Sequence, residues 1–181
     1  DKVRLDAMAV SDSKTFVNDL CLKKIPVGGI ELPNIVYEYA SDQLTVDAKN
    51  KLQGLITTMN DNPTLVIELG SHTDFRGGFK YNEDLAKRRA QSAVNFISES
   101  GVAMDRMEAK GYGEGTPKTI DSAVQGKLSA KQKGLFPVGT VLSENYIKKI
   151  KSKTTQEIAH QMNRRTEFKV LRTDYAVKPK E

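Results

Sequence analysis

Three polar side chains in the stretch SHTDFRGGFKYNEDLAKRRAQ (71–91) have the types and spacing to bind a charged ligand: Asp74, Asn82 and Arg89. If the second half of this stretch is a helix, its apolar stripe starts at Leu85 and continues on the far side of position 89, so that a guanidinium interrupts it. A charge taken out of water without a partner is strongly destabilising. We therefore expect Arg89 to find an acceptor that another part of the fold supplies.

The loop that precedes this helix supplies the nearest suitable acceptor, the carboxylate of Asp74. Asn82 lies two turns before Arg89 on the same side of the helix, so its amide faces the same space. Gly77 and Gly78 allow the backbone to curl closely around a bound group. The free N–H groups at a helix start also favour an anion.

Two hypotheses follow for this acid and this base. In the first, Asp74 and Arg89 pair directly and lock the loop to the helix. In the second, they stand slightly apart and share a ligand, because a carboxylate binds an ammonium group and a guanidinium binds a carboxylate in bidentate fashion. Such a pair would recognise an amino-acid zwitterion, and spacing alone leaves both hypotheses open.

The elements that position these side chains alternate between strand and helix. A helix is predicted to start after the cap residue Thr45 and to stop at NDNP, and a second is predicted from about Asn82, as its cap, to Ser100. Runs with strand character are 34–40, 64–72, 106–113 and 164–172. The order β-α-β-α-β-(insert)-β predicts an α+β (α/β) sandwich, with two helices packed on one face of a small mixed sheet.

The strand 64–72 is expected to have two unlike faces, because Leu65, Ile67 and Leu69 alternate with Val66 and Glu68. The insert before the last strand is longer than most connections in compact domains. Within it we expect two short helices, at 143–150 and 154–161.

The charge of the chain is concentrated in the insert. The 181 residues carry a net charge of +5, and residues 116–153 alone carry eight lysines against two acids, a local balance of +6 that leaves −1 for the remainder. A nucleic-acid surface usually adds arginine and aromatic residues for phosphate and base contacts, and this segment has no arginine. We therefore expect a solvated face and no nucleic-acid partner, with contact to an acidic partner as the alternative.

The composition also limits the kind of protein that this chain can be. With 38% hydrophobic and 28% charged residues, the chain is typical of one globular domain with a small appendage. No run approaches the ~18 apolar residues of a membrane span, and the charged start does not have the pattern of a signal peptide. Cys21 is the single cysteine, which excludes an internal disulfide and a four-cysteine zinc site. His72 and His160 lack metal-ligand spacing, so no metal and no cofactor is expected.

Three segments together resemble a known family. The chain reads HTDFRGGFKYNEDLAKRRA, then KGYGEGTP, then NRRTEF. In that order they are similar to the motifs hTDxxGxxxxNxxLSxxRA, KGYGExxP and NRRVEf of the OmpA-like C-terminal domain, the peptidoglycan-binding module of bacterial envelope proteins. The resemblance covers roughly residues 30–171. Ala86 departs from it, since the family often has serine there.

The resemblance implies a function and a site. The family's pocket holds the free end of meso-diaminopimelate in the peptide stem of peptidoglycan, with an aspartate on the ammonium and an arginine on the carboxylate. Transferred residue by residue, these roles fall on Asp74 and Arg89, with Arg165 favoured over Arg164 to reach the pocket. The full set of expected ligand-binding residues is Thr73, Asp74, Gly77, Asn82, Leu85, Arg89 and Arg165.

The resemblance also implies an organisation of the chain. Residues 1–29 are expected to form an extension or linker with a short strand, 30–173 the OmpA-like domain with an insert at about 116–160, and 174–181 a tail. The insert looks like the variant in Bacteroidota envelope proteins, some of which belong to the type IX secretion machinery. The implied place is the periplasm, in association with the outer membrane through regions outside this chain.

Two alternatives belong to other classes. Ser71, His72 and Asp74 supply the residue types of a hydrolase triad, but neighbouring strand residues point to opposite faces. A glycan hydrolase needs two carboxylates across a sugar, for which Glu68 with Asp74 or Asp84 would serve. We expect no catalysis from either set. The second alternative is a structural subunit that docks onto an envelope complex through its insert.

Overall fold

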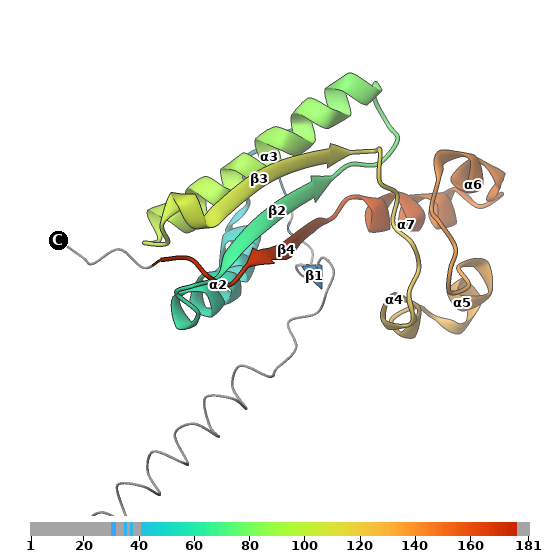
Figure 1. The fold of residues 1–181 in the computed structure, drawn as a ribbon. Coiled ribbons are helices and arrows are strands. Elements are labelled where there is room, and N and C mark those ends of the chain that lie inside the picture. The colour runs from blue at the N-terminus through green and yellow to red at the C-terminus, as the bar shows by residue number, and fades with distance from the viewer. Residues whose placement is uncertain (1–29, 32–34, 36, 38–40, 177–181) are drawn as a thin grey trace, which may run out of the picture.

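The computed structural model describes residues 30–31, 35, 37 and 41–176. Within these residues, four strands form one mixed sheet in the order β1-β4-β2-β3: β1 (Ile30–Glu31), β2 (Val66–His72), β3 (Met107–Gly113) and β4 (Thr166–Arg172). β2 pairs in parallel with β3 and antiparallel with β4, and β1 pairs antiparallel with β4. Figure 1 shows the helices α2 and α3 on one side of this sheet, which confirms the expected fold class.

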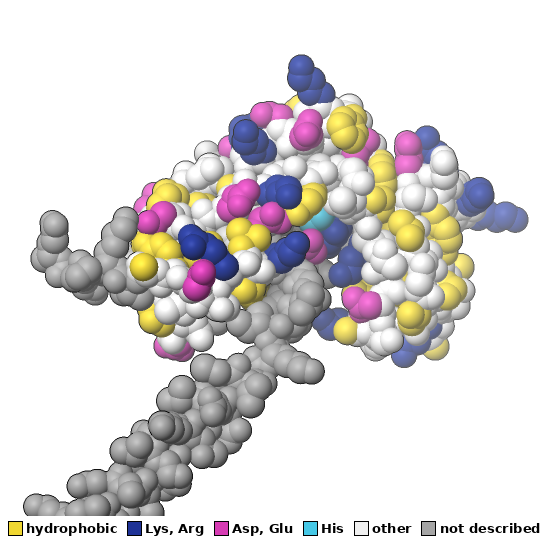
Figure 2. All heavy atoms as spheres, in the orientation of Figure 1, with side chains coloured by type: hydrophobic (Ala, Val, Ile, Leu, Met, Phe, Trp, Pro, Cys, Tyr) yellow, Lys and Arg dark blue, Asp and Glu magenta, His cyan; other side chains and the backbone are white. Residues whose placement is uncertain are grey.

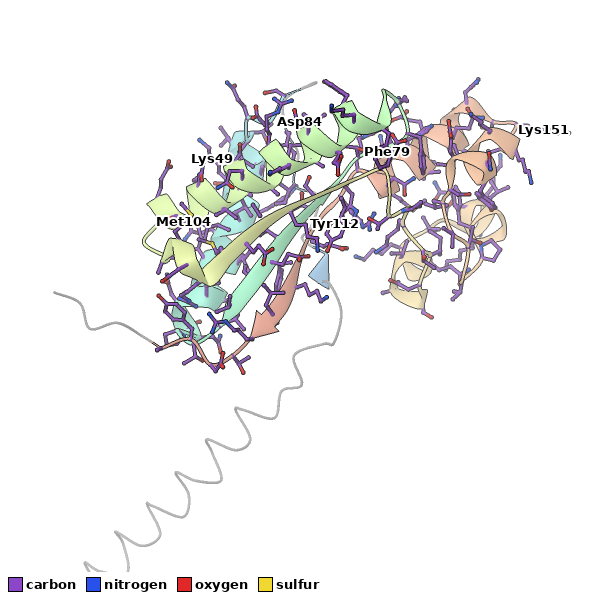
Figure 3. The ribbon with its side chains drawn as sticks, turned by 45° about the horizontal axis from the view of Figure 1, so that its top comes forward. Lys49, Phe79, Asp84, Met104, Tyr112 and Lys151 are labelled. Carbon is purple, nitrogen blue, oxygen red and sulfur yellow. The ribbon has the colours of Figure 1, made fainter. Side chains whose placement is uncertain are left out.

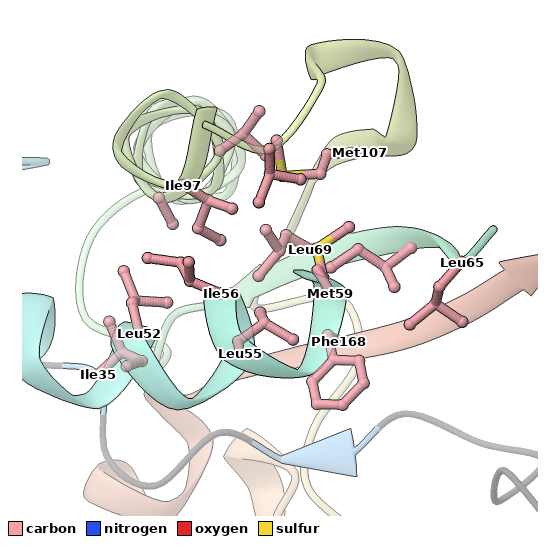
Figure 4. Packing of buried hydrophobic residues seen from close by; sticks show 14 of the residues in the cluster. Ile35, Leu52, Leu55, Ile56, Met59, Leu65, Leu69, Ile97, Met107 and Phe168 are labelled. Carbon is pink, nitrogen blue, oxygen red and sulfur yellow. The ribbon is translucent and has the colours of Figure 1, made fainter. Parts of the chain in front are cut away.

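The main core lies between the sheet and these two helices, α2 (Val46–Asp61) and α3 (Phe79–Glu99). Thr45 caps α2 as expected, since its side chain accepts a hydrogen bond from the N–H of Ala48. Figure 4 shows Leu52, Ile56 and Leu69 pointing into this core. A short 3₁₀ turn, η1 (Met104–Arg106), leads into β3. We call the sheet with α2 and α3 the body.

The second helix begins one turn earlier than the sequence suggested. α3 starts after Gly78, so Asn82 is the fourth residue of the helix and its expected role as the cap is wrong. The physical reason is that the amide of Asn82 is used elsewhere, donating to the backbone oxygen of Asp74 at 3.1 Å. The end of the helix agrees with the expectation, because Ser100 is the C-cap and Gly101 follows with a φ of 98°.

β2 has two unlike faces, but both are buried. Ile67 and Leu69 point into the main core. On the other face Glu68 accepts a hydrogen bond from the hydroxyl of Tyr112 and pairs with Lys110 at 3.3 Å. The alternation of side chains along β2 thus places apolar residues in the main core on one face. The polar Glu68 lies on the other face, which is also covered and not open to solvent.

The insert folds into a compact unit beside the body, which we call the lobe (residues 118–163). It contains α4 (Ser122–Gly126), α5 (Ala130–Leu135), α6 (Glu144–Lys149) and α7 (Lys153–Asn163). The last two confirm the helices expected at 143–150 and 154–161. Lysines lie on its surface, as Lys151 does at its far end (Figure 3).

A second hydrophobic cluster holds the lobe together. Its buried members are Ile120, Phe136, Leu142, Ile147 and Ala159. Phe75, in the loop that joins β2 to α3, packs against this cluster from the body. The loop that carries Asp74 is therefore attached to both units.

Several expectations fall wholly or partly outside the described residues. These are the extension 1–29 with Cys21, most of the strand 34–40 and the end of the tail. Within 34–40, Tyr37 forms an antiparallel bridge with Leu44. Among the described residues, no helix combines the length and the apolar character needed to cross a membrane.

Candidate functional site

A cavity of about 690 Å³ opens where β2 ends and α3 begins, beside α7 and the start of β4. Six of the seven residues expected to bind a ligand line it: Thr73, Asp74, Asn82, Leu85, Arg89 and Arg165. The lining does not include the seventh, Gly77, which instead has a φ of 111°, a left-handed conformation that favours glycine. A Cβ at this position would lie 3.2 Å from the side-chain oxygen of Asn82.

Asp74 is held by two arginines that were not expected as its partners. Its Oδ1 accepts the backbone N–H of Arg76 at 2.9 Å, and its Oδ2 accepts Nε of the same residue at 3.0 Å. A guanidinium nitrogen of Arg164 donates to the same Oδ2. Burial alone would raise the pKa of Asp74, but the hydrogen bonds from Arg76 and Arg164 outweigh it and lower the pKa below its usual value.

Arg89 finds its acceptor elsewhere. Its Nε donates to the backbone oxygen of Ser41 at 2.9 Å, and its guanidinium carbon lies 4.9 Å from the centre of the Tyr37 ring. The Tyr37 hydroxyl in turn donates to the backbone oxygen of Arg89. Burial lowers the pKa of Arg89 from its usual value, which leaves it a cation near neutral pH.

The direct pair between Asp74 and Arg89, one of the two hypotheses, is not formed. Among the described residues, Asp74 forms ion pairs with Arg76 and Arg164. Within the described part of the chain, Nη1 and Nη2 of Arg89 make no hydrogen bond, although the residue lines the cavity. One cavity therefore contains a carboxylate and a guanidinium that do not neutralise each other.

Two further buried groups on the cavity wall lack hydrogen-bond partners among the described residues, the hydroxyl of Thr73 and Nη1 of Arg165. The other nitrogens of this guanidinium are used, Nε for Glu167 and Nη2 for the backbone oxygen of Thr116, both at 3.3 Å. Buried polar groups are nearly always satisfied in native proteins. An unsatisfied donor on a cavity wall is thus a natural contact for a polar ligand.

The hydrolase arrangement considered for His72 is not formed. Its Nε2 lies 3.2 Å from Oε1 of Glu167, and its Nδ1 lies 2.9 Å from the hydroxyl of Thr116. Burial lowers the pKa of His72, so the ring is neutral, with one nitrogen donating and the other accepting. Both nitrogens are therefore engaged, and neither can serve Ser71 as a base.

The carboxylates considered for glycan hydrolysis are also separated. Glu68 is bonded to Tyr112 and Lys110 on the other side of the sheet and does not line the cavity. Asp84, labelled in Figure 3, pairs with Arg88 on the surface of α3. Among the described residues, no group of three or more His, Cys, Asp and Glu side chains could hold a metal ion.

Sequence reasoning missed several residues on the cavity wall, among them Arg76, Glu157 and Tyr37. It favoured Arg165 over Arg164, whereas both line the cavity and Arg164 contacts Asp74 directly. A local signal existed for Arg76, which lies two residues after the carboxylate it binds. Glu157 comes from the insert, which no motif connects to the pocket.

Comparison with known proteins gives the same architecture. The crystal structure of the peptidoglycan-associated lipoprotein from Burkholderia pseudomallei superimposes with a TM-score of 0.51 at 18% identity, over 75% of this chain and 87% of that one, a likeness of fold. Outer membrane protein A of Escherichia fergusonii is 35% identical over 72 residues, 40% of this chain and 29% of that protein.

A protein of Gloeobacter violaceus described as photosystem I P700 chlorophyll a apoprotein A2 is 31% identical over 117 residues, 61% of this chain and 13% of that protein. The chain thus spans less than a third of the length of either curated relative. The sequence profile of the OmpA family matches residues 36–130, more than half of the chain. The chain belongs to the OmpA family.

Proposed function

We propose that this chain binds peptidoglycan without covalent attachment, through the meso-diaminopimelate of the stem peptide, and so anchors an envelope protein to the cell wall. The observation that carries the proposal is that Asp74 and Arg89 line one cavity without pairing with each other. The free end of diaminopimelate is a zwitterion. Its carboxylate suits Nη1 and Nη2 of Arg89, which make no hydrogen bond within the described residues, and its ammonium suits Asp74.

Two further observations support a peptide ligand. Thr73 and Arg165 offer buried groups on the same wall that have no partner in the described part of the chain, and these suit a second carboxylate or an amide of the stem. The likeness in fold to a peptidoglycan-associated lipoprotein and the relationship to outer membrane protein A agree with this class of ligand and with a periplasmic place beside the outer membrane.

The test is a titration with a stem tripeptide that ends in meso-diaminopimelate, compared with the same peptide ending in lysine. Lysine lacks the second carboxylate. A missing charged hydrogen bond at a buried site is worth about 1.5–3 kcal/mol, so the lysine peptide is expected to bind more than tenfold more weakly. Equal affinity for the two peptides would refute diaminopimelate recognition, and this comparison requires no change to the protein.

Variants assign the effect to the site. Arg89→Ala and Asp74→Ala are each expected to abolish pull-down with purified sacculi while circular dichroism shows a folded domain. Arg88→Ala is the matched control, because this neighbour is exposed and forms surface pairs with Asp84 and Asp42. Release of soluble fragments from the sacculi would contradict binding without catalysis.

A second role is favoured by the surface of the lobe. Leu135, Val138 and Val141 are exposed there beside the lysines, and Figure 2 shows hydrophobic side chains scattered over this part of the molecule. Such a surface suits docking onto another envelope protein, for example in a secretion machine of the type IX kind. Val138→Glu with Val141→Glu should impair complex assembly and leave sacculus binding intact, and loss of both would argue against separate surfaces.

A further inference from the structure

The pocket and the lobe meet at a group of four charges, Asp74, Arg76, Glu157 and Arg164. Arg76 donates to Asp74 through Nε at 3.0 Å and to Glu157 Oε2 through Nη1 at 3.0 Å. Arg164 donates to both acids as well, with 2.8 Å to Glu157. Figure 2 shows acidic and basic side chains together where the body meets the lobe.

The carboxylate of Asp74 is covered by this group. Its side chain is only 7% exposed, and both oxygens already accept hydrogen bonds. Its Oδ2 accepts hydrogen bonds from the guanidinium groups of both Arg76 and Arg164, so an ammonium group can bind this oxygen only by replacing one of them. Arg76 is the easier of the two to move, because its side chain is 56% exposed whereas that of Arg164 is 31% exposed.

We propose that Arg76 is a latch over Asp74, and that Glu157 of α7 retains it when a ligand's ammonium group enters. This inference rests on the proposed function, since it concerns admission of a zwitterion to the same site. The exchange conserves charge pairing. Asp74 keeps Arg164 and gains the ammonium, while Arg76 keeps Glu157, to which Nη1 and Nη2 already donate at 3.0 and 3.4 Å.

The latch connects the insert to ligand affinity. Glu157 lies in α7, and Phe75, between Asp74 and Arg76 in the chain, packs against the hydrophobic cluster of the lobe. The loop that carries the latch is thus positioned by the lobe on one side and by β2 on the other. The inserted segment then controls how readily the carboxylate becomes available.

The experiment is a titration of the whole chain with the diaminopimelate tripeptide. Arg76→Ala removes the competitor for Asp74 and should tighten binding about two- to fivefold, the range of a partly exposed ion pair. Arg76→Met, which keeps the aliphatic stem, should do the same. Glu157→Gln should weaken binding about two- to fivefold, because the displaced arginine loses its acceptor, and this effect should shrink in the Arg76→Ala background.

A second ligand separates competition from simple blocking. A tripeptide in which the free amine of the diaminopimelate side chain is acetylated has no ammonium group there to bind Asp74. Arg76→Ala should therefore leave the affinity for this peptide unchanged. Tightening of this ligand as well would overturn the latch in favour of a steric role. Unchanged or weaker binding of the free tripeptide by Arg76→Ala and Arg76→Met would also overturn it.

The proposed function fails in a different way from the latch. If the wild-type chain does not distinguish the diaminopimelate tripeptide from the lysine tripeptide, the proposed function is wrong and the latch falls with it. If the wild type does distinguish them and Arg89→Ala abolishes binding, but Arg76→Ala does not tighten it, the latch alone is wrong.

Discussion

The body and the lobe bury their hydrophobic side chains by different means. In the body, helices of 16 and 21 residues lie against the sheet, and their long apolar stripes meet a strand that is buried on both faces. In the lobe, the four helices have only 5, 6, 6 and 11 residues. Isolated helices of that length are marginal in water, so the lobe needs other support.

Side-chain caps provide part of that support. Each lobe helix has a capping side chain that accepts a backbone N–H: Asp121, Ser129, Ser143 and Ser152. By contrast, the 21-residue α3 has Gly78 at its N-cap and no side-chain cap bond. Local capping thus matters most where tertiary packing is least, and a long helix on a sheet can form without it.

The two units also differ in whether their charged side chains are buried or exposed. The body buries Glu68, Asp74 and Arg106 with their partners. The lobe has seven of its eight lysines on the surface. Perturbed pKa values therefore cluster around the body and its pocket, as Asp74 and Glu167 show.

The largest effect is expected from removing the centre of the lobe core. Phe136 is fully buried, and Phe136→Ala should cost about 3–5 kcal/mol. Because the main core contains no lobe residue, this loss should unfold the lobe and leave the body folded. Amide hydrogen exchange should show fast exchange in α4–α7 with protection kept in β2 and α3.

The matched change in the body is Leu52→Ala, which opens a cavity in the main core. Throughout α2, α3 and the sheet, it should lower the free energy of opening measured by amide hydrogen exchange by about 2–5 kcal/mol. Loss of protection in β2 after Phe136→Ala would show instead that body and lobe form one cooperative unit.

A smaller contrast comes from the same substitution in each unit. A Cβ on Gly111 of β3 would lie 2.4 Å from the backbone nitrogen of Lys87 in α3, so Gly111→Ala should push the helix from the sheet and cost about 3 kcal/mol. Gly134 in α5 has nothing within 4 Å of the added atom. Gly134→Ala should therefore be neutral or stabilise by up to about 1 kcal/mol.

Urea unfolding of the two glycine variants measures this contrast. Equal effects would mean that the approach of β3 to α3 is looser than the distances indicate.

The body was the more predictable unit, for a physical reason. Its elements contain periodic apolar patterns long enough to identify, and Thr45 marked the start of α2. The position of Asn82 was misjudged because a glycine cap gives no side-chain signal. In the lobe, α4 and α5 were not predicted, because they are too short to show a helical period of apolar residues. Ser129 and Gln132 form a capping box that could have been recognised in the sequence.

Much of the cavity lining could be predicted from the sequence, but the pairing of its charged side chains could not. Motif spacing identified Asp74 and Arg89 as residues of one pocket, and both line it. The pairing of Asp74 with Arg164 could not be inferred, because Arg164 lies 90 residues away. The partner of Arg89 is a backbone oxygen, that of Ser41, and backbone acceptors have no sequence signature.

Removing a charge beside the pocket of the body is expected to have a smaller effect than disturbing its packing. A hydrogen bond with His72 and the nearby Arg165 lower the pKa of Glu167 to about 2, against a usual 4.5. Such a carboxylate stabilises the fold fully above its usual pKa, and the contribution is lost as the pH falls from about 4.5 towards 2.

Glu167→Gln should accordingly lower the free energy of unfolding by about 2 kcal/mol at pH 6, less than the full shift implies because the side chain is partly exposed. The difference from the wild type should shrink as the pH falls through this window, since the glutamine can still accept the hydrogen bond from His72. Urea unfolding at pH 6, 4 and 3 measures it. A difference that stays constant over that range would mean that the lost stability does not come from the charge of Glu167.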